Sequence, residues 1–406
     1  MTNRILGAAA IAIAVTAPIG AQSAELRIGF INSLSGGAAI IGKHQLNGWM
    51  LGLESEGWGK NGDMLGGVPM KLFTGDDQRK VDVGLRAADK MLKSDKAHIV
   101  AGIIWSNILA AVQRRVIKAR RIMISTNAGW SGMAGKSCSP YFISTSWNND
   151  QTPEAMGQLI NQDGLKNVFI MSANYQAGKD MANGFKRYYK GKVAGQILYK
   201  LGARDFQAEI SKVRAAKPEA LFIFAPGGMG VAFVKQWAAS GAGKNIKLYT
   251  VFTVDHLTLP PIGEAAVGSY HTNYWQPDSD RPANVKFVKD YMAKFKSMPS
   301  HFASQAYDAP RLIAATLKKM GGKFSEGNLL AFAKAMRTTP YDSVRGSYKY
   351  NVNGFPIQNF YKREVIMGAD GKPTIVTRST VFTNHIDSHW EKCPKKNRYP
   401  AQVSAN

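Results

Sequence analysis

Polar side chains follow two apolar stretches in the first half of the chain, where they could hold a small molecule. "GIIWSN" ends at Ser106 and Asn107, and "MISTNAGW" places Asn127, Ala128 and Gly129 after its apolar residues. Serine or asparagine at the start of a helix caps that helix, and capping needs no ligand. The free N–H groups of a helix start also suit a carboxylate. The pattern therefore leaves capping and anion binding both open.

Aromatic residues near these stretches are candidates for the walls of such a site. A single aromatic residue is more often packed in a core or a hinge than against a ligand. Several aromatic residues near strand ends favour a binding site more than one alone does. The candidates are Trp105, Trp130, Trp147, Tyr175, Phe252 and Tyr307.

Catalytic motifs are absent from the sequence. It lacks the Gly-x-Ser-x-Gly elbow, the His-Glu-x-x-His zinc motif and the Walker loop. His385 and His389 lie four residues apart, but Asp387 and Glu391 beside them complete no known metal pattern. We therefore expect a binding protein rather than an enzyme, with no metal and no cofactor. An exported enzyme is the alternative, and turnover of a bound ligand would support it.

The elements that must position these residues alternate between apolar strands and amphipathic helices. Such a rhythm is typical of a parallel sheet covered by helices on both faces. It runs once through the first 125 residues and then restarts, which predicts two doubly wound α/β lobes. Ligands bind at the carboxyl ends of such strands, and two facing lobes form a cleft. The strands are expected at 26–32, 70–77, 98–104 and 122–125, and again at 167–172, 193–199, 220–226 and 246–252.

The first 24 residues have the features of a secretory signal peptide. Arg4 precedes an apolar run from Ile5 to Ala17, and small residues follow up to Ala24. The run is too short for a membrane span. We therefore expect an exported protein that is not embedded in the membrane.

The chain is strongly basic, with a formal net charge of +24. The basic residues are spread along the whole length, and no nucleic-acid-binding motif accompanies them. We therefore expect no nucleic-acid partner, and a general attraction for anions instead. The only two cysteines, Cys138 and Cys393, suggest one disulfide in an oxidising compartment, with two free thiols as the alternative.

Nearly the whole mature chain resembles the type I periplasmic solute-binding proteins of ABC importers, in the group usually labelled branched-chain amino-acid binding. The segments that carry the resemblance arrive in family order and include "IGFINSLSGGAAIIGKHQLNGWMLGLE", "RIMISTNAGW" and "ASQAYDAPRLI". The resemblance implies two lobes that close around one solute and then dock on an inner-membrane ABC permease. Three hinge crossings are implied near 144–150, 272–275 and 345–351.

The resemblance also implies domain boundaries and site residues. Lobe 1 would comprise 25–145 and 273–348, lobe 2 would comprise 146–272 and 349–385, and 386–406 would be a basic tail. The family holds a solute carboxylate at positions that match polar strand ends of this chain. The implied ligand-binding residues are Ser35, Ile41, Trp105, Ser106, Asn107, Asn127, Ala128, Gly129, Tyr175, Pro226, Gly227, Phe252 and Tyr307.

The chain departs from the family's amino-acid binders at one informative position. These proteins grip the solute ammonium with an acidic residue, and the matching position here falls at or next to Phe252. An unpaired buried ammonium is costly. We therefore expect a small organic anion, an aromatic carboxylate of the benzoate or cinnamate kind, and the chain is similar to the subgroup that binds such acids. The alternative is a branched-chain or other aliphatic amino acid or amide, with Asp255 gripping the amine.

Overall fold

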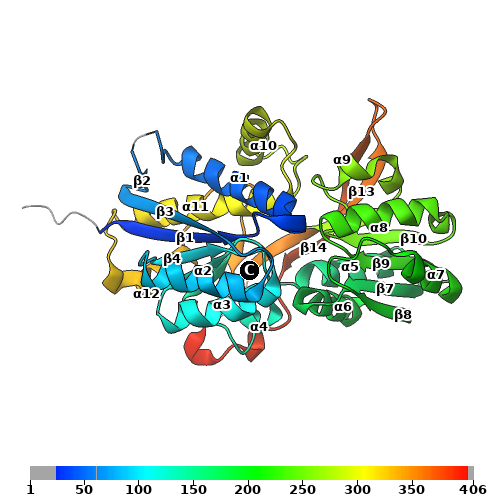
Figure 1. The fold of residues 1–406 in the computed structure, drawn as a ribbon, viewed down its shortest axis with the longest axis horizontal. Coiled ribbons are helices and arrows are strands. Elements are labelled where there is room, and N and C mark those ends of the chain that lie inside the picture. Colours follow the sequence, from blue (N-terminus) through cyan, green and yellow to red (C-terminus); the bar gives the residue numbers. More distant parts are fainter. Residues whose placement is uncertain (1–23, 61, 401–406) are drawn as a thin grey trace, which may run out of the picture.

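The computed structural model describes residues 24–60 and 62–400. The chain forms two α/β lobes, each built around its own sheet, which lie side by side along the long axis of the molecule (Figure 1). The expected fold class is confirmed. The predicted signal peptide lies outside the described residues, except for Ala24.

The first lobe contains a six-stranded sheet in the order β2-β3-β1-β4-β5-β6, parallel except for the β2–β3 pair. Its central strands are apolar and buried on both faces, as the sequence pattern predicts for a covered sheet. Alternate side chains of a strand belong to two different hydrophobic cores, one on each face of the sheet. Ile99 packs toward α1 and α11, whereas Val100 packs toward α2 and α3. The elements are β1 (Leu26–Asn32), α1 (Ala39–Ser55), β2 (Met64–Leu65), β3 (Val68–Asp76), α2 (Val81–Lys93), β4 (Ile99–Gly102), α3 (Ser106–Lys118), β5 (Ile122–Ser125), α4 (Ser131–Ala134), β6 (Phe142–Ser144), α10 (Pro282–Phe295), α11 (His301–Lys319) and α12 (Leu329–Met336).

The second lobe contains a sheet in the order β12-β13-β11-β10-β9-β7-β8, with β14 paired to β13. The strands from β8 to β11 are parallel, whereas β12, β13 and β14 are antiparallel. The long β13–β14 hairpin was not among the predicted strands. The elements are α5 (Gln151–Gln162), β7 (Asn167–Ala173), α6 (Gln176–Tyr188), β8 (Lys192–Tyr199), α7 (Gln207–Ala216), β9 (Ala220–Phe224), α8 (Gly228–Ala239), β10 (Lys247–Val251), α9 (Leu259–Ile262), β11 (Tyr270–Asn273), β12 (Lys349–Tyr350), β13 (Pro356–Met367) and β14 (Pro373–His385).

The chain passes between the lobes three times, from β6 to α5, from β11 to α10 and from α12 to β12. Arg345, on the third passage, contacts the other two. Its Nη1 donates to the Ser146 carbonyl at 3.0 Å, and its guanidinium lies 5.4 Å from the centre of the Tyr274 ring. The three connections are therefore held together by one buried side chain.

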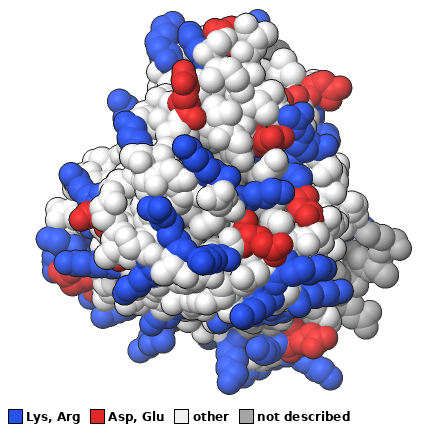
Figure 2. Space-filling view, turned by 90° about the vertical axis from the view of Figure 1, so that its right-hand side faces the viewer, with Lys and Arg blue, Asp and Glu red and all other residues white. Residues whose placement is uncertain are grey.

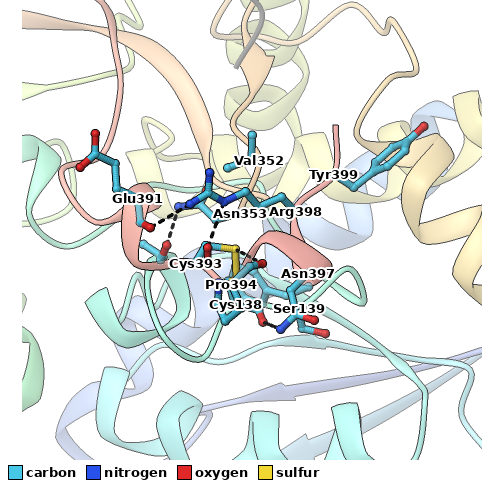
Figure 3. The surroundings of a disulfide bond; sticks show 12 residues. Cys138, Ser139, Val352, Asn353, Glu391, Cys393, Pro394, Asn397, Arg398 and Tyr399 are labelled. Carbon is cyan, nitrogen blue, oxygen red and sulfur yellow. Dashed lines mark hydrogen bonds between the residues drawn. A yellow bond between two sulfur atoms is a disulfide. The ribbon is translucent and has the colours of Figure 1, made fainter. Parts of the chain in front are cut away.

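The segment after β14 returns to the first lobe and is covalently attached there. A disulfide joins Cys138 to Cys393, with 5.5 Å between their Cα atoms, which confirms the predicted pairing. Hydrogen bonds surround it (Figure 3): Asn397 Nδ2 donates to the Cys138 carbonyl at 2.9 Å, and Arg398 Nε donates to the Cys393 carbonyl at 2.9 Å. The segment expected to be a tail is thus fixed from residue 386 to residue 400.

Lysine and arginine side chains are scattered over the end of the second lobe, with fewer acidic side chains between them (Figure 2). They form no single stripe on this face. Within the part of the chain that the structure describes, no helix combines the length and the apolar character needed to cross a bilayer.

Candidate ligand-binding site

A small cavity of about 20 Å³ lies between the two lobes, at the carboxyl ends of their strands. This volume holds about one water molecule, so the wall side chains must move apart to admit a solute. Both lobes and the first crossing contribute to its walls. The lining residues are Ile41, Ile104, Trp105, Ser106, Asn127, Ala128, Trp147, Asn149, Tyr175, Ala177, Met181, Phe224, Pro226, Phe252 and Phe302.

Three helices begin at this cavity. α3 starts at Ser106, α6 starts directly after Tyr175, and α8 starts two residues after Pro226. Each helix start carries unpaired N–H groups and the positive end of the helix dipole. Among residues 24–60 and 62–400, no acidic side chain lines the cavity. The site therefore favours a negative group over a positive one.

Aromatic rings form one connected chain in the cavity wall, because Phe224 also meets Phe252 edge to face at 6.4 Å. Trp105 meets Tyr175 edge to face, with 5.7 Å between ring centroids, and Tyr175 stacks near Phe224 at 6.2 Å. Trp147 packs on Phe252 at 4.4 Å. These rings bring large apolar surfaces together across the lobes, which suits a flat apolar ligand body.

Asn149 organises the polar side of the cavity. Its Nδ2 donates to Ser106 Oγ at 3.0 Å and to Asp180 Oδ2 at 2.9 Å, while its Oδ1 accepts from the Gly129 amide at 3.2 Å. Because Ser106 Oγ accepts this bond, its own hydroxyl proton can point to a ligand oxygen. Burial raises the pKa of the Asp180 carboxyl, which lies behind the asparagine. Trp147 Nε1 is buried without a partner in the described chain and is a further donor in the wall.

The strand end at Asn127 and Ala128 is held by protein partners. Asn127 Nδ2 donates to the Ile104 carbonyl at 2.8 Å, and its Oδ1 accepts from Gln305 Nε2 at 2.7 Å. The Ala128 amide donates to the Ile103 carbonyl at 3.1 Å. Both residues line the cavity, but the groups that we expected to face a carboxylate have other partners in this structure.

Gly129 serves the first crossing rather than the cavity. Its amide is bound to Asn149, and a methyl group at this position would lie 2.4 Å from the Trp147 carbonyl oxygen. Only glycine permits this close approach. Trp130 does not line the cavity, and its ring packs against Gly132 at the start of α4.

Eight of the predicted site residues line the cavity and five do not. Ser35 is exposed before the short helix Gly36–Ala38, and Asn107 lies one residue further around α3 than Ser106. Tyr307 packs its ring on Phe287, with 4.6 Å between centroids. The structure brings together Ile41, Trp105, Ser106, Asn127, Ala128, Tyr175, Pro226 and Phe252 and leaves out Ser35, Asn107, Gly129, Gly227 and Tyr307.

Several lining residues were missed by the sequence reasoning. Phe224 is the last residue of β9, so the rule that ligands lie at strand ends could have found it. Trp147 was considered as a wall candidate but was not chosen for the site. Phe302, from α11, and Met181, from α6, show no local pattern that would have marked them.

Asp255, the alternative partner for an amine, does not line the cavity. Its Oδ1 accepts from the amides of Leu257 and Thr258 at 2.8 and 2.9 Å, closing the turn after β10. Its Oδ2 lies 3.5 Å from His301 Nδ1 and has no hydrogen-bond partner in the described chain. Burial raises the pKa of the Asp255 carboxyl to about 6. Phe252, not this carboxylate, contributes to the wall.

Metal ligands do not gather at the cavity or elsewhere in the described ranges. No group of three or more His, Cys, Asp or Glu residues there could hold a metal ion. The chemistry of the cavity is therefore that of hydrogen bonding, helix ends and aromatic surfaces.

Two α/β lobes, three connections and an enclosed cavity between the lobes define a two-lobed solute-binding protein. The chain belongs to the periplasmic binding protein family, whose model matches residues 25–372. Among curated relatives, it is 25% identical over 373 residues to the "Leu/Ile/Val-binding protein homolog 6" of Brucella melitensis, which covers 89% of this chain and 93% of that protein.

Solved structures of solute-binding proteins share this fold. One from R. palustris, in complex with benzoate, is 28% identical with a TM-score of 0.83 and covers 90% of this chain and 99% of that one. Another from Rhodopseudomonas palustris BisB5, in complex with 3,4-dihydroxybenzoic acid, is 28% identical with a TM-score of 0.81 and the same coverage. A leucine-binding protein from Thermotoga maritima is 18% identical with a TM-score of 0.76 and covers 87% and 98%, which shows the fold alone.

Proposed function

We propose that this protein is the substrate-binding component of an ABC importer and that its solute is a small aromatic carboxylate such as benzoate or a hydroxybenzoate. The observation that carries the proposal is the composition of the cavity. Three helix starts and the Ser106 hydroxyl surround it, aromatic rings form its walls, and no acidic side chain of the described chain lines it.

The residues that line the cavity indicate how the aromatic carboxylate would lie in it. The carboxylate lies at the α3 start, where Ser106 donates its hydroxyl proton and Asn149 holds that hydroxyl in place. The ring packs against the aromatic wall to which Trp105, Tyr175, Trp147 and Phe252 belong. A neutral, aromatic cavity of this kind leaves an α-ammonium group without a counter-charge, and such a group is costly to bury.

The lobes move about the three connections, and the closed form docks on an inner-membrane permease. Lobe 1 comprises 25–145 and 273–348, and lobe 2 comprises 146–272 and 349–385. Residues 1–24 direct export to the periplasm. The solved relatives that bind benzoate and 3,4-dihydroxybenzoic acid support the ligand class.

An aliphatic amino acid is the second candidate solute, favoured by the names of the curated relatives. It requires Asp255 to turn its free Oδ2 toward the cavity. The side chain would then have to rotate while Oδ1 keeps its hydrogen bonds from the Leu257 and Thr258 amides.

Isothermal titration of the protein, after unfolding and refolding to remove any retained solute, tests the proposal. Benzoate and 4-hydroxybenzoate should bind with micromolar or lower Kd, which corresponds to about 8 kcal/mol or more. Benzamide has the same shape without the charge and should bind at least about tenfold more weakly, because charge-assisted hydrogen bonds are roughly twice as strong as neutral ones.

Leucine, isoleucine and phenylalanine complete the series. Phenylalanine carries both the ring and an ammonium group, so it separates ring recognition from rejection of the amine. Binding of leucine or isoleucine without binding of benzoate would refute the aromatic-acid proposal and support the second candidate.

A further inference from the structure

The cavity adjoins a second, outer hollow between the lobes. This hollow has a volume of about 500 Å³ and is also lined by both lobes. Ile41, Trp105 and Pro226 line both spaces and lie at the boundary between them, which we call the neck. A solute that leaves the cavity by this route must pass the Trp105 ring.

Arg79 lies over this ring from the outside. Its guanidinium carbon is 5.8 Å from the centre of the Trp105 ring, within the range of a cation–π contact. The half-buried side chain also lines the outer hollow and forms no ion pair with any carboxylate in the described part of the chain. Its charge is thus directed to the neck rather than neutralised by a neighbour.

The backbone that carries Arg79 is strained and is fixed by the same hydrogen bonds that hold Trp105. Gln78 and Arg79 have φ angles of 51° and 60°, a left-handed conformation that is unfavourable for side-chain-bearing residues. Asp77 Oδ1 accepts from the Arg79 amide at 2.8 Å and from Ser33 Oγ at 2.5 Å. Ser33 Oγ in turn accepts from Trp105 Nε1 at 2.9 Å. One buried network therefore positions both the arginine and the indole.

Arg79 also reaches across the cleft to the second lobe. It extends from the loop between β3 and α2, and a methyl group placed on Gly202, between β8 and α7, would lie 3.3 Å from its Nη2. Gly202 has a φ angle of 89°, and its lack of a side chain leaves room for the guanidinium. The contact joins the lobes, so it exists only when they are close together.

We propose that Arg79 is a latch that retains the bound anion by covering the neck when the lobes are closed. This proposal rests on the proposed function, because it needs an anionic solute in the cavity. The guanidinium blocks the exit beside Trp105 and attracts the carboxylate behind it, so opening must break the contact with the second lobe first. Its effect therefore falls mainly on the dissociation rate.

Stopped-flow kinetics with benzoate and 4-hydroxybenzoate test the latch. Arg79→Gln should raise the dissociation rate constant about tenfold, the effect of losing a contact of roughly 1.4 kcal/mol. Arg86→Gln is the matched control, since it removes an equal charge from an exposed side chain of the neighbouring helix. It should change the dissociation rate constant less than about twofold, as expected for a screened surface charge.

Two further variants separate a latch from a general charge effect. Arg79→Lys keeps the charge but not the planar group, so the association rate constant should be retained while dissociation stays fast. Gly202→Ala perturbs the same contact from the second lobe, because the added methyl group crowds the Arg79 guanidinium. This variant should also accelerate dissociation. The melting temperature without ligand reports whether each variant is folded.

The results separate the two proposals. If the wild-type protein binds neither acid, the proposed function fails and the latch fails with it. If the wild-type protein binds, and Arg79→Gln dissociates no faster than Arg86→Gln, the latch alone is overturned, even if association slows.

Discussion

Replacing Asp255 with asparagine should stabilise the protein at neutral pH, because the buried carboxylate lacks a charged partner. Its Oδ2 faces His301, whose pKa is lowered by burial, so the histidine is neutral at pH 7. Asparagine retains the Oδ1 that accepts from the Leu257 and Thr258 amides. Its Nδ2 can also donate to His301 Nδ1.

The pKa of Asp255 sets the size of the effect. Burial raises this pKa from 3.8 to about 6. Because the folded state binds the proton more tightly than the unfolded state, the wild-type protein gains stability as the pH falls from 6 to 3.8. At about 1.36 kcal/mol per pKa unit, the ionised carboxylate destabilises the folded state above pH 6 by about 3 kcal/mol. Asp255→Asn removes this penalty and its pH dependence.

Urea unfolding at pH 7.5 and pH 4.5 measures the difference. Asp255→Asn should raise the free energy of unfolding by about 3 kcal/mol at pH 7.5, and the gain should shrink toward zero near pH 4. Asp205→Asn is the control, since this exposed aspartate also accepts an amide bond, from Gln207 at 3.1 Å. An equal gain at both pH values would refute the reasoning. Loss of leucine binding in the same variant would instead favour the amino-acid function.

Three other changes give distinct expected outcomes. Replacing Cys138 and Cys393 with alanine should lower the free energy of unfolding by about 2–5 kcal/mol, because the bond closes a loop with a sequence separation of 255, and urea unfolding measures the loss. His98 has its pKa lowered to about 4 by burial, so its stabilising contribution is present above pH 6.5 and is lost as the pH falls to 4; His98→Asn should flatten this part of a stability–pH curve. Gly227→Ala should lower the free energy of unfolding by about 1 kcal/mol or more, as urea unfolding would show, because a side chain at this position strains a backbone with a φ angle of 64°.

Much of the fold could be predicted because the sequence repeats one local pattern. Apolar strands separated by amphipathic helices indicate covered parallel sheets, and the restart of the pattern indicates a second lobe. The antiparallel β13–β14 hairpin was not predicted, because Pro356–Met367 and Pro373–His385 mix polar and apolar residues and lack the continuous apolar runs of the parallel strands. In the sheet, β13 also pairs with β11, which lies about ninety residues earlier in the chain.

The cavity could be predicted only where it follows strand ends. Ser106 and Tyr175 lie at the junction of a strand and a helix, and the topology of such sheets places these junctions at one edge. Asn149, Trp147 and Phe302 come from the first crossing and from α11, so their presence depends on how the lobes meet.

By itself, the sequence determined the positions of the parallel strands and the helices between them and which strand ends carry hydrogen-bonding groups, since both follow from local spacing. It also indicated the cysteine pair, because only two cysteines exist, with two free thiols left as the alternative. The tertiary structure decided which of those groups remain available. It gave the Ala128 and Gly129 amides protein partners, turned Tyr307 into a core residue and placed Arg79 over Trp105. Hydrogen-bond partners and lobe contacts lie far apart along the chain, so only the folded arrangement specifies them.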